Sequence, residues 1–121
     1  MTKLILIVED NEFNRDMLSR RLKKKGYEVC AVADGREFID VLKTISPNIV
    51  LLDIIMPVMD GLTALKKVRT DKANPTFPVI GLSAHAREDE KQKAFEAGCI
   101  AYQTKPVDLD ILIAKIEELT N

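Results

Sequence analysis

Two apolar stretches decide the fold of this chain of 121 residues: LILIV at Leu4–Val8 and IVLL at Ile49–Leu52. Both stretches are short, continuous and rich in branched side chains, which is typical of strands buried on both faces of a parallel sheet. The first is followed directly by Glu9 and Asp10, and the second by Asp53. Because open α/β sheets bind their ligands at the carboxyl edge, we expect these three carboxylates to mark the functional site.

The composition limits the kinds of protein that the chain can be. Its length and its 46% hydrophobic content suit a single domain, residues 1–121, with one core. The 18 basic and 19 acidic residues leave a net charge of −1, so we expect no direct contact with nucleic acid or with a membrane. The first apolar stretch is too short for a signal peptide or a membrane span, which predicts a soluble, cytoplasmic protein. Cys30 and Cys99 lack metal-type spacing and are expected to be reduced and partly buried.

Apolar strand patterns alternate with amphipathic helix patterns about five times, which predicts a doubly wound, flavodoxin-like (βα)5 fold with five parallel strands. We expect the strand order 2-1-3-4-5, because it opens a crevice between the first and third strands, which carry the acids. Apolar residues at helical spacing from Phe38 to Ile45 predict a second helix that continues to the break at Ser46–Pro47. Residues 87–97 have the pattern of a polar helix with few apolar anchors, which we expect to be more mobile than its neighbours.

Serine and lysine side chains complete a site suited to phosphoryl transfer. Ser83 ends the fourth predicted strand and Lys105 follows the fifth, so both are expected on the same edge as the acids. Mg²⁺ would take oxygen ligands from Asp10 and Asp53 directly and from Glu9 through water. Asp53 would then act as the nucleophile and form an acyl phosphate. Lys105 would pair with Asp53 before the reaction and with a phosphate oxygen after it, while Ser83 offers its hydroxyl to another oxygen.

Four motifs stand at the ends of predicted strands: VEDN at Val8–Asn11, LDIIMP at Leu52–Pro57 with Asp60–Gly61, LSA at Leu82–Ala84, and TKP at Thr104–Pro106. Together they closely resemble the motifs of the receiver domain of two-component response regulators, in particular free-standing receivers of the chemotaxis type. The resemblance covers essentially the whole chain and implies the same strand order.

The resemblance implies a role for each matching residue. It also implies a cis peptide bond at Lys105–Pro106, an uncommon state that tight turns can hold. The implied roles are phospho-acceptor for Asp53, magnesium ligands for Glu9, Asp10, Asp53 and the Ile55 backbone carbonyl, switch groups for Ser83 and Tyr102, and phosphate contact for Lys105.

Receivers signal by shifting between two conformations. Phosphorylated Asp53 would draw the Ser83 hydroxyl inward and leave space into which Tyr102 turns. The surface formed by the fourth helix, the fifth strand and the fifth helix would then change shape. Ile55 and His85 would flank the path of the hydrolytic water and tune the lifetime of the acyl phosphate. Because an apolar Ile55 cannot orient water, we expect slower dephosphorylation than in an Ile55→Asn variant.

The expected partners are proteins. A sensor histidine kinase or a histidine phosphotransfer protein would donate the phosphoryl group, docking on the first helix near Asn11, Asn14 and Arg15. The sequence NEFN at Asn11–Asn14 resembles receivers that serve phosphorelays or hybrid kinases. Because no output domain follows Asn121, the signal is expected to leave through contact with a downstream protein target.

Three alternatives are open at this point. A flavodoxin-like cofactor binder shares the fold, but the acidic loop after the first strand would repel a phosphate. A metal-dependent phosphohydrolase needs a general acid close to its nucleophile, whereas Asp53 is followed by Ile54-Ile55-Met56. A degenerate receiver would be a phosphorylation-independent binding module, which the complete set of site residues disfavours. We therefore expect no enzyme activity beyond phosphorylation and dephosphorylation of Asp53 itself.

Overall fold

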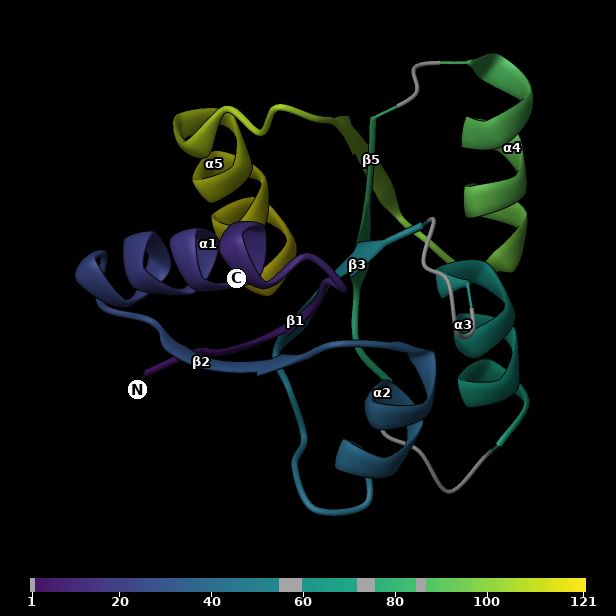
Figure 1. The fold of residues 1–121 in the computed structure, drawn as a ribbon, viewed down its shortest axis with the longest axis horizontal. Coiled ribbons are helices and arrows are strands. Elements are labelled where there is room, and N and C mark those ends of the chain that lie inside the picture. The colour runs from purple at the N-terminus through teal and green to yellow at the C-terminus, as the bar shows by residue number, and fades with distance from the viewer. Residues whose placement is uncertain (1, 55–59, 72–75, 85–86) are drawn as a thin grey trace.

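The computed structural model describes residues 2–54, 60–71, 76–84 and 87–121, in which strands and helices alternate along the chain (Figure 1). Within these ranges every helix is too short or too polar to cross a lipid bilayer. The strands are β1 (Leu4–Val8), β2 (Glu28–Val32), β3 (Ile49–Asp53), β4 (Val79–Ser83) and β5 (Ala101–Thr104). The helices are α1 (Glu12–Lys24), α2 (Gly35–Val41), α3 (Gly61–Thr70), α4 (Glu88–Ala97) and α5 (Leu109–Thr120).

The strands form one parallel sheet in the order β2-β1-β3-β4-β5, which confirms the predicted topology. Val8 of β1 pairs with Leu52 of β3, so the residues that follow them, Glu9 and Asp53, lie level at the carboxyl edge. At the same edge, Ser83 of β4 pairs with Thr104 of β5, one residue before Lys105.

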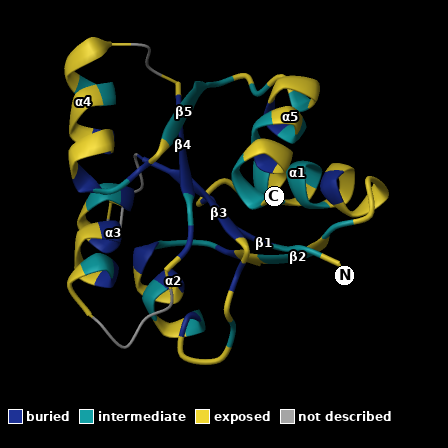
Figure 2. Ribbon diagram, turned by 180° about the vertical axis from the view of Figure 1, so that it is seen from behind, coloured by how far each residue is buried: buried dark blue, intermediate teal, exposed yellow. Residues whose placement is uncertain are grey.

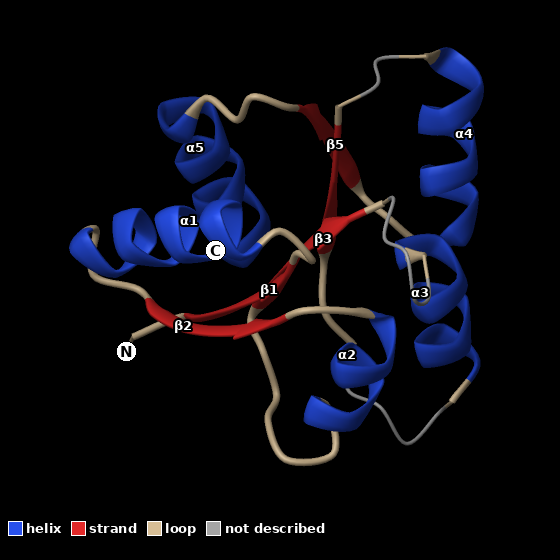
Figure 3. Cartoon of the chain, in the orientation of Figure 1, coloured by secondary structure: helices blue, strands red, loops and turns tan. Residues whose placement is uncertain are grey.

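Helices cover both faces of the sheet. Figure 3 shows α1 and α5 on one side and α2, α3 and α4 on the other. Because side chains alternate along a strand, each face has its own core, and the central strands are the most deeply buried part of the molecule (Figure 2). On the α1 and α5 side the buried residues are Ile5, Ile7, Leu22, Ile49, Leu51, Ile80, Leu82, Leu112 and Ile116. The opposite core includes Leu6, Val8, Phe38, Val50, Leu52, Ala64, Leu65, Val68, Val79, Ala94 and Ala97.

Helix α2 is shorter than its apolar spacing predicts. It ends at Val41, and the amides of Lys43 and Thr44 each donate to the carbonyl three residues earlier, at 3.1 and 3.0 Å. These tighter bonds close the helix before Ile45, which still packs against the core from the following turn. The predicted apolar contact is therefore present, but the prediction that the helix continues to the Ser46–Pro47 break is wrong.

Gly61 lets helix α3 begin directly against the end of β3. Its amide donates to the Ile54 carbonyl at 2.9 Å, and a Cβ atom at this position would collide with the backbone carbonyl of Asp53. The preceding residue, Asp60, caps the helix by accepting a hydrogen bond from the Thr63 amide at 2.8 Å. The Asp60–Gly61 pair thus holds the backbone around Asp53 in place.

The two cysteines are free thiols, as the sequence predicts. Cys30 is half-buried and Cys99 is buried, and burial raises the pKa of the Cys99 thiol to about 12. A thiol of that kind is a packing residue rather than a nucleophile.

Candidate phosphoryl-transfer site

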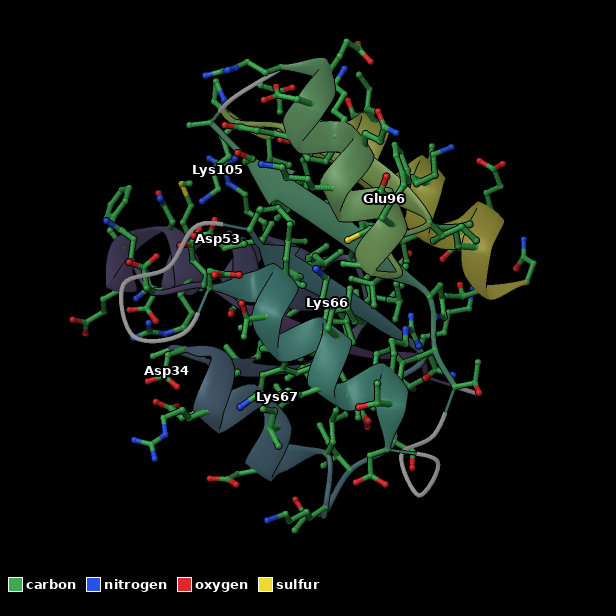
Figure 4. The ribbon with its side chains drawn as sticks, turned by 90° about the vertical axis from the view of Figure 1, so that its right-hand side faces the viewer. Asp34, Asp53, Lys66, Lys67, Glu96 and Lys105 are labelled. Atoms are coloured by element: carbon green, nitrogen blue, oxygen red, sulfur yellow. The ribbon has the colours of Figure 1, made fainter. Side chains whose placement is uncertain are left out.

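Three charged side chains from separate strand ends meet at the carboxyl edge of the sheet. The Lys105 Nζ atom lies 2.6 Å from Glu9 Oε1 and 3.3 Å from Asp53 Oδ2. Glu9 and Asp53 are buried, at 4% and 5% exposure, while Lys105 is half-buried. Figure 4 shows Asp53 and Lys105 beside each other at this edge. The structure therefore brings together the residues that the sequence placed here, although Glu9 is the nearer partner of Lys105.

Backbone hydrogen bonds between the strand ends set this geometry. The Lys105 amide donates to the Ser83 carbonyl at 2.7 Å, which ties the turn after β5 to the end of β4. The Glu9 amide donates to the Val32 carbonyl at 3.1 Å, so β1 continues its pairing up to the acid itself. The Lys105–Pro106 peptide bond is cis, as the resemblance implied.

Crowding of the carboxylates shifts their protonation in opposite directions. Burial, followed by the hydrogen bond and negative charge of Glu9, raises the pKa of Asp53 to about 7, although Lys105 opposes this shift. For Glu9, burial also favours the neutral form, but hydrogen bonds from Asp53, Lys105 and the Asn11 amide together hold its pKa below the usual value. The crowded pair therefore favours protonation of Asp53 over protonation of Glu9.

The acids also have the donor set of a divalent-cation site. Glu9, Asp10 and Asp53 each offer a carboxylate oxygen, and these atoms lie within 4.8 Å of one another. Asp10 is exposed, whereas the other two are buried. Mg²⁺ prefers oxygen ligands and commonly uses one or two carboxylates. The single positive charge of Lys105 does not neutralise the three carboxylates of this site. The residues present therefore fit a magnesium ion.

The two predicted switch residues lie on the strands next to the site. Ser83 is buried at the end of β4, with 1% exposure, one residue beyond the pairing partner of Asp53. Tyr102 is half-buried in β5 and packs against the core beneath α4, where the Lys91 Nζ atom lies 5.9 Å from the centre of its ring. Tyr102 thus connects the sheet to α4, and its switch role remains a prediction.

Two predicted residues, Ile55 and His85, lie outside the described residues. The predicted metal ligation by the Ile55 carbonyl and the predicted effects of both side chains on dephosphorylation therefore remain predictions. The described part of the site begins again at Asp60 and, after β4, at Arg87.

Arg15 has a role that the sequence did not reveal. We expected it on the docking surface with Asn11 and Asn14, but its guanidinium turns back and donates to the Glu9 carbonyl at 2.9 Å. Asn11 caps α1 by accepting a hydrogen bond from the Asn14 amide at 2.9 Å. A flexible arginine gives little sign in the sequence of which carbonyl it will contact.

Comparisons with known proteins agree with this geometry. The family model described as "Response regulator receiver domain" matches residues 5–117. The polar-differentiation response regulator DivK of Brucella ovis is 32% identical over 117 residues, which cover 97% of this chain and 95% of DivK.

Solved structures of receiver domains have the same fold. The receiver domain of the sensor histidine kinase PA1611 of Pseudomonas aeruginosa PAO1, with a magnesium ion coordinated in its active-site cleft, superposes with a TM-score of 0.90 at 28% identity, covering 99% of this chain and 98% of that one. The Ssk1 receiver of Saccharomyces cerevisiae, in complex with the histidine phosphotransfer protein Ypd1, gives a TM-score of 0.91 at 29% identity, covering 98% and 89%.

Proposed function

Because the chain belongs to the response regulator receiver domain family, and is therefore a receiver of two-component signalling, we propose that Asp53 is its phosphoryl acceptor. The donor is a sensor histidine kinase or a histidine phosphotransfer protein, and the reaction uses Mg²⁺. The observation that carries this proposal is the buried Asp53 carboxylate held at the sheet edge with Glu9 and Lys105, next to exposed Asp10. No other cluster of three or more metal-ligating acids, histidines or cysteines occurs among the described residues.

The chemical step transfers one phosphoryl group from a phosphohistidine of the donor to the Asp53 carboxylate. An oxygen of the ionised Asp53 attacks the phosphorus of phosphohistidine, a P–O bond forms as the P–N bond breaks, and the leaving imidazole takes up a proton. Asp53 must lose its own proton first, because only the carboxylate is a nucleophile. Lys105 favours that ionised state, since its ammonium lies 3.3 Å from Asp53 Oδ2.

Lys105 and Ser83 are proposed to hold the product. The new phosphoryl group carries more negative charge than the carboxylate that it replaces, so the ammonium that bridges Glu9 and Asp53 can turn to one of its oxygens. The Ser83 hydroxyl can donate to a second oxygen.

Magnesium would be held by Asp10 and Asp53, with Glu9 nearby and the Ile55 carbonyl as a further proposed ligand. Bound there, it neutralises charge that otherwise repels an anionic donor. The side chains of this chain prepare that site, because burial and the nearby Glu9 carboxylate raise the pKa of Asp53, and a divalent cation would offset the repulsion between the two carboxylates.

The output of the switch is proposed to be the α4-β5-α5 surface. Inward movement of Ser83 toward the phosphoryl group would leave room for Tyr102, and Tyr102 is in contact with the core beneath α4. A change in Tyr102 would therefore alter its cation–π contact with Lys91 and the position of α4 on the sheet. A downstream protein that binds this surface would detect the change.

The donor is proposed to dock beside α1. A largely apolar groove with a volume of about 390 Å³ opens next to Lys105 and Glu9, and Met17, Leu18 and Val107 help to line it. Phe13, at the start of α1, is 73% exposed and adds apolar surface close to the site. Such a surface is suited to the helices of a phosphotransfer partner.

Intact-mass spectrometry tests the proposal. Wild-type protein incubated with Mg²⁺ and acetyl phosphate should gain one phosphoryl group, and the adduct should be absent from Asp53→Asn and strongly reduced when EDTA replaces Mg²⁺. An Asp34→Asn variant is the matched control, because this carboxylate caps α2 away from the cluster. A wild-type protein that gains no phosphate, or an Asp53→Asn protein that gains as much as the wild type, would overturn the assignment and favour a phosphorylation-independent binding module.

A further inference from the structure

We propose that Arg15 is a positioning residue that prepares the acidic site for its cation. This inference rests on the proposed function of the site and adds to it a residue outside the carboxylate and lysine set. The Arg15 Nη1 atom donates to the carbonyls of both Glu9 and Asp10, at 2.9 and 3.4 Å. The side chain of a helix thus holds the backbone of the turn that carries two of the three acids.

The start of α1 holds Arg15 in position. Its amide donates to the Asn11 carbonyl at 2.9 Å, and its own carbonyl accepts a hydrogen bond from the Ser19 hydroxyl at 2.7 Å. The side chain is half-buried rather than extended into solvent. Among the described residues, Arg15 has no carboxylate partner within ion-pair distance, so its hydrogen bonds go to the backbone of the turn.

The turn needs such support because its acids repel one another and are not equally held. Glu9 is fixed by Lys105 and by the Asn11 amide, which donates to Glu9 Oε2 at 3.2 Å. Asp10 is exposed, so side-chain packing does little to orient it. A hydrogen bond to its carbonyl restricts the peptide that carries it. Without Arg15, the turn would relax away from Asp53, and cation binding would have to order it again.

Arg15 also has a positive charge. Its charge and its hydrogen bonds to the turn predict opposite changes in Mg²⁺ binding when the side chain is replaced. If charge dominated, removal of a nearby cation would strengthen Mg²⁺ binding. If positioning dominates, loss of the planar, multi-donor guanidinium weakens Mg²⁺ binding whether or not the charge is kept. Charge near the surface is screened by solvent and salt, whereas a hydrogen bond to a fixed turn is not, so we expect positioning to dominate.

The experiment is a Mg²⁺ titration of metal-free protein, followed by amide shifts in two-dimensional NMR spectra. We compare Arg15→Lys, which keeps the charge, Arg15→Gln, which removes it, and the control Arg20→Gln, an exposed arginine of the same helix. Both Arg15 variants should show a Mg²⁺ dissociation constant three to ten times that of the wild type, and Arg20→Gln should stay within twofold. At saturating Mg²⁺, the Arg15 variants should still take up phosphate from acetyl phosphate.

Urea unfolding without Mg²⁺ separates positioning from simple stability. A purely structural role predicts a lower unfolding midpoint with an unchanged Mg²⁺ dissociation constant, and that result overturns the proposal. So does tighter Mg²⁺ binding by Arg15→Gln. If Arg15→Gln fails to fold, Arg15→Lys alone decides. A wild-type protein that takes up no phosphate would contradict the proposed function, while weakened Mg²⁺ binding in the variants would still support the role of Arg15.

Discussion

Helices α4 and α5 come directly before and after the edge strand β5 along the chain and cover opposite faces of the sheet, but they are attached to the sheet in different ways. Helix α5 buries two large apolar side chains, Leu112 and Ile116, in the core. Helix α4 buries only Ala94 and Ala97 among its residues, and Figure 2 shows its outer surface as largely exposed. Because burial of a leucine or isoleucine contributes about 2 kcal/mol and an alanine methyl much less, α5 is held far more strongly.

Capping at the N-terminal ends of the two helices also favours a firmer attachment of α5. The Asp108 side chain caps α5 by accepting a hydrogen bond from the Ile111 amide, whereas the N-cap of α4, Arg87, makes no capping hydrogen bond. The C-terminal end of α4 is better held, because Arg69 Nη2 donates to the Gly98 carbonyl at 3.3 Å. The comparison teaches that α4 has less buried apolar surface than α5 and lacks a side-chain cap at its N-terminal end, so a switch at the site can shift α4 more easily than α5.

The largest expected effect comes from truncating the better-packed helix. Leu112→Ala in α5 should lower the free energy of unfolding by about 2–5 kcal/mol, because it removes a fully buried side chain and leaves a cavity. Ala94→Gly in α4 should cost only about 1 kcal/mol, mainly through helix propensity. Urea unfolding monitored by circular dichroism measures both. Equal losses would show that α4 is packed as firmly as α5 and would break the comparison.

The pH dependence of stability gives a second test. It arises from the charges at the site, and varying the pH leaves the sequences of α4 and α5 unchanged. Asp53 has a pKa of about 7 in the folded protein and near 3.8 otherwise, so the folded state binds its proton more tightly. Without Mg²⁺, the free energy of unfolding should therefore fall as pH rises from about 5 to 8, by ~1–3 kcal/mol. The lowered pKa of Glu9 acts in the opposite direction but at lower pH, below its ordinary value of 4.5.

Asp53→Asn should remove this pH dependence and stabilise the metal-free protein at pH 8, as should saturating Mg²⁺ in the wild type. Thermal unfolding from pH 5 to 8, with and without Mg²⁺, provides the measurement, and Asp34→Asn serves as control. Hydrogen exchange under the same conditions extends the comparison of α4 with α5. The protection of α4 amides should change more with pH and Mg²⁺ than the protection of α5 amides. A wild-type protein equally stable at pH 5 and pH 8 would mean that folding does not raise the pKa of Asp53.

The sequence predicted well whatever depends on the regular geometry of strands. Glu9, Asp53, Ser83 and Lys105 end or follow parallel strands, and such residues must meet at one edge. It predicted less well what depends on side-chain rotamers. The nearer contact of Lys105 with Glu9 and the return of Arg15 to the β1–α1 turn each depend on a long side chain selecting among several acceptors.

Helix boundaries show the same limit. The apolar spacing from Phe38 to Ile45 continues through the turn after Val41, because a turn can bury a side chain as a helix does. The polar pattern of residues 87–97, by contrast, located α4 within one residue and predicted its weak anchoring. A helix with few apolar residues has few side chains to bury, and this can be read from the sequence alone.

The smallest expected effect is a gain of stability at the uncapped N-terminal end of α4. Arg87 has the extended backbone of an N-cap, with φ −73° and ψ 139°, but its side chain makes no capping hydrogen bond. Arg87→Ser would supply a capping hydroxyl, and it would remove a cation from the positive end of the helix. We expect a gain of about 0.5–1 kcal/mol, since among the described residues the substitution breaks only the exposed Arg87–Asp89 ion pair.

Hydrogen exchange locates that gain, because amides in the first turns of α4 should become more protected while those of α5 remain unchanged. Asp108→Ala, which removes the existing cap of α5, is the matched control and should cost about 1 kcal/mol. If the missing cap of α4 permits the switch, Arg87→Ser should also reduce the change in α4 protection when Asp53 is phosphorylated. A stabilised α4 that responds to phosphorylation as fully as the wild type would place the moving element elsewhere on the sheet.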